Sequence, residues 1–228
     1  ADGYSRVTGK IGVALIIADQ GVPKGRLRVS AALGHGRLAI VPLVAAFTAR
    51  YPNITVDLSL GDEVVDILAG QADVAVRFGP LPDSPLTARR IGETRQVVVA
   101  SPDYLQRHGT PLQPEDLAEH NCLRFNFRRA EPNWPFLRDG QTFSLQVCGN
   151  IACSSGEALA QLARVGAGIA RIGEFSVAED LQRGDLVPLL QAFNPDDREP
   201  IHAVFVGGSA MPAGVRLFVD FLVEHHRM

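Results

Sequence analysis

The sequence predicts an α/β protein with two lobes, each built around a mainly parallel sheet. Strand-like and helix-like patterns alternate along most of the chain, and a strand–loop–helix unit occurs in each half, at residues 25–52 and 145–173. The 228 residues, 46% hydrophobic and 21% charged, are enough to bury a sizeable core. Ligands of open α/β sheets bind at strand carboxyl ends, so we expect the two loops to face a ligand cleft.

The first unit comprises a strand, a loop and a helix. Residues 27–31 alternate apolar and polar side chains, as a strand requires. Five apolar side chains then recur at helical spacing: Ile40, Leu43, Val44, Phe47 and Tyr51. Because Pro42 belongs in a first helical turn, we expect a helix at Leu38–Tyr51 and a loop at Leu33–Arg37. Backbone N–H groups and the positive end of the helix dipole then suit this loop to a small anion.

The next segments predict two strands, at residues 54–60 and 72–76, around a short helix. Asp62 is expected to cap this helix, and Gly70 to end it. Its packing residues share a helical spacing: Val64, Val65 and Leu68. This alternation implies a mainly parallel sheet that is covered on both faces.

The rest of the chain predicts a long strand at residues 87–100 and then a second region. In order, we expect a helix at 102–108 capped by Ser101, a helical turn at 115–119, a strand at 122–127, a hairpin around 133–140, a strand at 145–148, a polar cap at Ser154–Ser155, a helix at 156–165, a strand at 169–172, a helix at 174–183, strands at 186–190 and 201–206, and a last helix from Pro212.

Composition excludes several classes of protein. The net charge is −3, and no Lys/Arg run is longer than a pair, so the chain alone is a poor DNA binder. Three irregularly spaced cysteines argue against a disulfide framework and fit a reducing, cytoplasmic location: Cys122, Cys148 and Cys153. Cys148 and Cys153 could oxidise to a bond and sense redox, but we expect them to be buried structural thiols, which are commoner. The apolar run Ile11–Ala18 is too short for a membrane span and lacks a signal-peptide pattern.

A set of ordered motifs resembles a known family. The motifs are GRLRVS, FTARYP, GDEVVDILAGQADVAVRFG, SPDYLQRHGTP, PEDLAEHNCL, LARVGAGIARIG and GDLVPLL. Their order is similar to that in the effector-binding domain of LysR-type transcriptional regulators, over about residues 25–228. This resemblance implies two Rossmann-like lobes joined by two crossover strands, as in type-2 periplasmic binding proteins. Gly173 stands where the family usually has proline.

The resemblance also implies the domain boundaries. Lobe I would comprise residues 25–100 plus 203–228, and lobe II residues 101–202, with crossovers near Ala100–Ser101 and His202–Ala203. Residues 1–24 would be a remnant of the linker to the family's N-terminal winged helix-turn-helix, which we expect to be absent from this chain.

In function, the resemblance implies an effector-sensing domain with no catalytic activity, no cofactor and no membrane partner. A small anion, such as a carboxylate, would bind in the interlobe cleft, and dimer geometry would relay the signal to the DNA-binding domains. We expect a homodimer or homotetramer, because Leu38, Val41 and Ala45 give the 38–51 helix a second apolar face. In the family, this helix packs on the lobe-two helix of a second subunit, here residues 156–165.

The ligand-binding candidates that match the family's effector corners are Leu33, Gly34, His35, Gly36, Asp62, Ser154 and Ser155. Three further candidates could face the cleft: Arg77 and Phe78, which follow the third strand, and Phe125. Arg77 suits a carboxylate through its bidentate fork. Structural alternatives stay open: a plain turn for 33–36, a helix cap for Asp62, a surface ion pair for Arg77, and core packing for Phe125 or Phe127. Capping by the two serines is compatible with ligand binding.

Two alternatives remain, a solute-binding transport receptor and a dinucleotide-dependent enzyme. Gly34, Gly36 and Ala39 fit G-x-G-x-x-A, but the matching acid, Asp57, lies inside its strand. The segment 153–156 lacks the first glycine of a nucleophile elbow. The histidines are scattered and no carboxylate pair stands out, so the sequence predicts no catalytic or metal site.

Overall fold

The computed structural model describes residues 23–63, 65–81, 83–126, 133–209 and 211–226. Nearly all of the predicted linker remnant, together with Val64 and Phe127, lies outside these residues. The described chain forms two compact units. Unit 1 comprises residues up to Ala32, Gly36–Gly92 and the residues from Ile201 onward, and unit 2 comprises Leu33–His35 and Glu93–Pro200. None of the helices in the described part has the length and apolar character needed to span a membrane.

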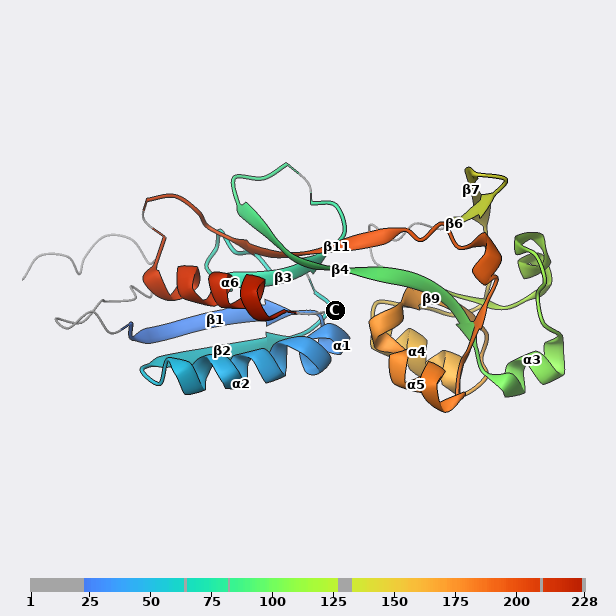
Figure 1. The fold of residues 1–228 in the computed structure, drawn as a ribbon, viewed down its shortest axis with the longest axis horizontal. Helices are drawn as coiled ribbons and strands as arrows, with labels where there is room; N and C mark the ends of the chain where they lie inside the picture. Colours follow the sequence, from blue (N-terminus) through green and yellow to red (C-terminus); the bar gives the residue numbers. More distant parts are fainter. Residues whose placement is uncertain (1–22, 64, 82, 127–132, 210, 227–228) are drawn as a thin grey trace, which may run out of the picture. The chain divides into compact units, whose positions relative to one another are not determined.

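Unit 1 is built on a mainly parallel sheet (Figure 1). β1 (Gly25–Ala31) lies between β2 (Ile54–Leu60) and β3 (Val74–Phe78) and pairs with both in parallel. β11 (Arg198–Phe205) pairs antiparallel with β3 through its last five residues. The three predicted parallel strands are therefore confirmed.

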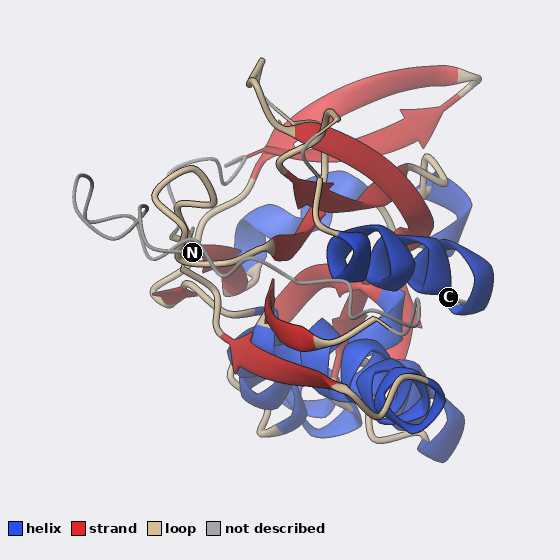
Figure 2. Ribbon diagram, turned by 90° about the vertical axis from the view of Figure 1, so that its left-hand side faces the viewer, coloured by secondary structure: helices blue, strands red, loops and turns tan. Residues whose placement is uncertain are grey.

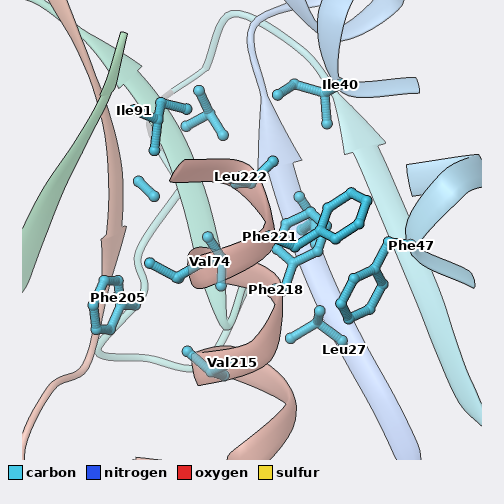
Figure 3. Packing of buried hydrophobic residues seen from close by; sticks show 14 of the residues in the cluster. Leu27, Ile40, Phe47, Val74, Ile91, Phe205, Val215, Phe218, Phe221 and Leu222 are labelled. Carbon is cyan, nitrogen blue, oxygen red and sulfur yellow. The ribbon is translucent and has the colours of Figure 1, made fainter. Parts of the chain in front are cut away.

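Two helices share one face of this sheet. Phe47 of α2 (Val41–Arg50) lies edge-on to Phe218 and Phe221 of α6 (Ala213–His225), with ring centroids 5.0 and 5.4 Å apart. Figure 3 shows these rings above Leu27 of β1, which is fully buried. Edge-to-face aromatic pairs each add about 0.5–1.5 kcal/mol beyond area burial. The predicted apolar stripe of the first helix is confirmed, because Leu43, Val44 and Tyr51 pack against the same core.

The predicted loop at Leu33–Arg37 is wrong, because the chain is already helical there. α1 (Leu33–His35) leads into a π turn, η1 (Gly36–Ile40), and then into α2. Pro42 does lie in the first turn of α2, as predicted. The position of Pro42 fixes only where the regular α-helix can begin, because proline has no N–H to donate to the carbonyl four residues back. It does not exclude a π turn immediately before that helix, and η1 is such a turn.

The predicted helix after Gly61 is also wrong. Among the described residues of this segment, the chain makes a turn in which the Asp66 carboxylate accepts the Ala69 N–H at 2.9 Å. Leu68 is 59% exposed, whereas Ile67 is buried and packs with Ala75 and Val204. A turn, rather than a helix, therefore packs on Ala75 of β3 and Val204 of β11, on the face of the sheet opposite α2 and α6.

Unit 2 alternates short strands and helices around a mixed sheet. Figure 2 colours the helices of the chain blue and its strands red. In order, its elements are β4 (Thr87–Ala100), which begins in unit 1, α3 (Pro102–His108), η2 (Pro114–Glu119), β5 (Cys122–Phe125), β6 (Asn133–Arg138), β7 (Gln141–Gln146), β8 (Ala152–Cys153), α4 (Gly156–Arg164), β9 (Ile169–Gly173), η3 (Glu174–Ser176), α5 (Ala178–Arg183), β10 (Val187–Leu189) and η4 (Gln191–Phe193). β5 pairs in parallel with β8 and β9, and β4 pairs antiparallel with β9 and β10.

Several predictions for unit 2 are confirmed. Ser101 caps α3, because its hydroxyl accepts the Tyr104 N–H at 3.3 Å. β6 and β7 form the expected antiparallel hairpin. The long strand at 87–100 has the predicted bounds.

Other predictions for unit 2 are wrong. The predicted strand at 145–148 does not lead into α4, because Leu145 and Gln146 are the last residues of β7. The strand that directly precedes α4 is the short β8, which pairs with β5. The helix expected at 174–183 is divided at Val177 into η3 and α5. All three cysteines are free; Cys148 is exposed rather than buried, and Cys153 is only partly buried.

Candidate functional site

Arg77 is a half-buried cation in unit 1. It is the second-last residue of β3 and does not follow the strand as predicted. Its Nη1 donates to the neighbouring Val76 carbonyl at 2.9 Å, and its Nη2 lies 3.5 Å from the Ser30 hydroxyl. Among the described residues, Arg77 makes no ion pair. Burial lowers the pKa of Arg77, which reports the cost of desolvating the charged form. An anion at this position would offset that cost.

Two further polar residues share this part of the sheet. Ser30, on β1, is 3% exposed. His202, on β11, lies opposite Arg77 in the antiparallel register, so the two side chains point to the same face. The buried Nδ1 of His202 has no hydrogen-bond partner among the described residues. Burial, and secondly the charge of Arg90, lowers the pKa of His202, so its ring is neutral at pH 7. Arg77, Ser30 and His202 therefore form a polar cluster, here called the Arg77 cluster.

The other unit 1 candidates have different surroundings. An ideal Cβ on Gly36 would lie 2.3 Å from Leu60 Cδ2, so close packing against β2 accounts for this glycine. Phe78 follows Arg77 in the strand, points to the opposite face and packs against the core. Asp62 is exposed and caps no helix, because the described residues between Gly61 and Gly70 form a turn rather than a helix.

In unit 2, the candidates gather at the N-terminus of α4. Ser155 occupies the N-cap position, but its side chain makes no capping hydrogen bond, so the prediction of a serine cap is wrong. Its buried hydroxyl oxygen has no hydrogen-bond partner among the described residues. Ser154 is exposed. Phe125, at the end of β5, lies with its Cζ 3.9 Å from an ideal Cβ on Gly156. The first N–H groups of a helix lack intrahelical acceptors, so this helix end offers donors to an anion.

Leu33–His35 belongs to unit 2 and packs against α4 and η3. An ideal Cβ on Gly34 would lie 3.4 Å from Glu157 Oε2, in the first turn of α4. The His35 ring, 1% exposed, meets the Phe175 ring edge-on, with centroids 5.7 Å apart. The structure therefore brings Leu33, Gly34 and His35 to the helix end that carries Ser155.

Sequence reasoning missed Ser30, His202, Glu157 and Phe175. Ser30 and His202 reach Arg77 only through strand pairing across long sequence separations. The usable signal was that each is a polar residue inside a predicted strand. Glu157 had a local signal, because it falls in the first turn after a predicted cap.

The described residues give little support to an enzyme site. Gly34 and Gly36, which suggested a dinucleotide fingerprint, lie in helical turns rather than in a glycine-rich loop after a strand. No group of three or more His, Cys, Asp or Glu in the described part of the chain could hold a metal ion.

Comparisons with known proteins agree on one family. The LysR substrate binding domain family matches residues 20–227. The HTH-type transcriptional regulator CrgA of Neisseria meningitidis serogroup C (strain 8013) is 37% identical over 209 residues, which cover 92% of this chain and 70% of that protein.

Solved structures give the same result. The regulatory domain of CrgA, a LysR-type regulator from Neisseria meningitidis, has a TM-score of 0.82 and 36% identity, covering 90% of this chain and 100% of that one. The full-length virulence activator AphB of Vibrio cholerae has a TM-score of 0.76 and 29% identity, covering 90% of this chain and 69% of that one.

These relatives are transcriptional regulators, so the comparisons favour neither a transport receptor nor a dinucleotide-dependent enzyme. LysR-type regulators bind small-molecule effectors and DNA, and they function as oligomers. Their regulatory domains have the type-2 periplasmic-binding-protein-like α/β fold expected from the sequence. The chain therefore belongs to the LysR-type transcriptional regulators, in which it is the effector-sensing regulatory domain and not an enzyme.

Proposed function

We propose that the effector is a small anion, such as a carboxylate, and that each unit offers it one group of donors, the Arg77 cluster in unit 1 and the N-terminus of α4 in unit 2. The observation that carries this proposal is Arg77, a half-buried guanidinium with no carboxylate partner among the described residues. A bidentate carboxylate would supply the missing charge and accept from both nitrogens of the fork.

The α4 end supports the same ligand chemistry. Its N–H groups and the Ser155 hydroxyl are donors, and the helix dipole adds positive potential. Leu33, Gly34 and His35 pack beside these donors, and Phe125 adds an apolar surface. The combination suits a carboxylate that carries a short apolar or aromatic body.

Isothermal titration calorimetry with benzoate, acetate and succinate tests the proposal. We expect Arg77→Gln to weaken carboxylate binding about tenfold or more, because it removes a positive charge and a bidentate pair of hydrogen bonds. Ser155→Ala should weaken binding less, because it removes one hydrogen bond from a neutral donor. Arg216→Gln removes an exposed charge on α6 and serves as the matched control. If neither Arg77→Gln nor Ser155→Ala changes the affinity of a carboxylate that binds the wild type, the proposal is wrong.

We further propose that the two units act as the family's two effector-binding lobes. An effector that has different affinities for two lobe arrangements shifts the population between them. The shift would reach DNA-binding domains through the geometry of a homodimer or homotetramer, in the cytoplasm.

The exposed face of η1 and α2 is the proposed subunit contact. Leu38 and Val41 are 45% and 43% exposed, and Ala45 beside them is exposed too. Val165, just after α4, is 66% exposed. The resemblance pairs these two helices across subunits, and both present apolar side chains as that pairing requires.

A further inference from the structure

Unit 2 contains a polar cavity at the end of α4 farthest from Ser155. Its volume is about 430 Å³, within the range of small-molecule pockets. Its polar side chains come from α3 and two loops: Tyr104, Arg107, His108, His120, Asn121 and Asn150. None of the described residues that line it is an Asp or a Glu. The nine residues of α4 span about 14 Å, so the cavity is distinct from the helix end that carries Ser155.

Arg107 is held in place by neutral acceptors. Its Nε donates to the Asp103 carbonyl at 3.1 Å, and its Nη2 donates to the Gly166 carbonyl at 2.8 Å. Gly166 permits this approach, because its φ is +75° and a Cβ there would lie 2.7 Å from Arg107 Nη2. Among the described residues, no carboxylate pairs with Arg107. The guanidinium is therefore oriented while its positive charge is not neutralised.

A hydrogen-bonded chain orients the buried donors beside it. The Asn121 N–H donates to Tyr104 Oη at 2.9 Å, so the Tyr104 hydroxyl proton is available to His120 Nδ1 at 3.3 Å. A neutral His120 ring that accepts at Nδ1 carries its proton at Nε2, as a second donor. Tyr104 and His120 are 2% and 9% exposed. The chain thus leaves one donor, the Nε2–H of His120, whose ring is held by Tyr104 before any ligand binds.

The remaining lining groups are fixed in the same way. Asn121 Nδ2 donates to the Ala167 carbonyl at 2.7 Å, and Asn121 Oδ1 accepts the Asn150 N–H at 2.9 Å. The His108 ring stacks on Tyr104, with centroids 4.5 Å apart. The charges of Asp116 and Glu119 act on His120, and the Asp116 carboxylate also accepts the Leu112 and Gln113 N–H groups.

We propose that this cavity binds a small oxyanion, a phosphate or carboxylate group, at Arg107, His108 and His120. The site is separate from the effector position proposed at Arg77 and Ser155. The regulatory domain would then have a second ligand-binding site, formed by residues of unit 2 alone.

Cys148 provides a direct readout, because it lines the cavity and is the exposed cysteine. Cys122 is buried, and burial raises the pKa of its thiol to about 12, so it stays unreactive. Iodoacetamide, a neutral reagent, would modify Cys148 in the presence of phosphate, benzoate or chloride at equal ionic strength. Cys148 and Cys153 share one tryptic peptide, residues 139–164, so fragmentation of that peptide in the mass spectrometer tells which of the two is modified.

We expect phosphate or benzoate, but not chloride, to slow Cys148 modification saturably. Arg107→Gln should raise the half-protecting concentration about tenfold. His108→Gln, which leaves the Arg107 hydrogen bonds intact, should also raise it, whereas Arg216→Gln should not. Protection by phosphate alone identifies a phosphate site, and protection by benzoate alone a carboxylate site. Equal protection by chloride, protection confined to Cys153, or unchanged protection in folded Arg107→Gln and His108→Gln overturns the proposal.

Discussion

The Arg77 guanidinium lies 3.5 Å from the Ser30 hydroxyl, and Val76 supplies its only other hydrogen bond among the described residues. A buried charge with so few partners lowers stability. We therefore expect Arg77→Leu to raise the free energy of unfolding by about 1 kcal/mol while abolishing carboxylate binding. Urea unfolding and calorimetry check the two effects. A less stable Arg77→Leu protein would indicate that Arg77 is a structural residue.

Gly36 and Gly61 make a matched pair. A Cβ on Gly36 would lie 2.3 Å from Leu60 Cδ2, whereas a Cβ on Gly61 meets nothing within 4 Å. We expect Gly36→Ala to cost about 1–3 kcal/mol by overpacking, and Gly61→Ala to change stability little. Equal midpoints for both variants in urea unfolding would mean that β2 yields to the added methyl group.

Two serines at helix N-caps should also differ. The Ser101 hydroxyl accepts the Tyr104 N–H, and the Ser155 hydroxyl makes no capping hydrogen bond. We expect Ser101→Ala to lower the free energy of unfolding by about 1 kcal/mol and Ser155→Ala to leave it nearly unchanged. Thermal unfolding of both variants, without ligand, measures the difference. A stability loss in Ser155→Ala that matches Ser101→Ala would show that Ser155 does cap α4.

Stability should fall in mild acid because of buried histidines. Burial lowers the pKa of His120, His202 and His226 below the ordinary value of 6.5. The unfolded chain therefore binds protons that the folded protein does not, so the free energy of unfolding falls as pH drops below 6.5 and levels off below the folded pKa values.

Each such histidine contributes at most about 1.4 kcal/mol per pH unit. His226→Gln should make urea midpoints measured between pH 7 and pH 5 fall less steeply, because it removes one of these titrating groups. An unchanged slope would show that His226 titrates equally in both states.

Val41→Glu tests the proposed subunit contact. Val41 is 43% exposed on the apolar face of α2, and Ala46, also exposed, lies about 140° around the helix. We expect Val41→Glu to shift the protein to monomers in analytical ultracentrifugation, because a charge buried at an interface is costly. Ala46→Glu should keep the wild-type assembly. Identical sedimentation of the wild type and both variants would place the contact elsewhere.

Local patterns predicted most strands of this fold, because strand alternation and the Gly and Pro positions act over a few residues. The bounds of β4 and the Ser101 cap followed directly. The failures had tertiary causes. Whether Ile67 or Leu68 is buried depends on Ala75 and Val204, which lie on other elements.

The candidate site divides in the same way. Arg77 and Ser155 were recognisable from their places beside a strand end and a helix start. Ser30 and His202 were not, because only the register of β1, β3 and β11 brings them to Arg77.

Unit 1 is assembled from the early part of the chain, residues up to Ala32 and Gly36–Gly92, and from the distant residues that begin at Ile201. During synthesis, β3 therefore emerges with an open edge, and it stays unpaired there until β11 leaves the ribosome more than a hundred residues later. Unit 2 is nearly contiguous and can fold first. Phe218 and Phe221 follow β11 in the chain, so the nascent chain exposes the apolar surface around Phe47 until α6 has been synthesised.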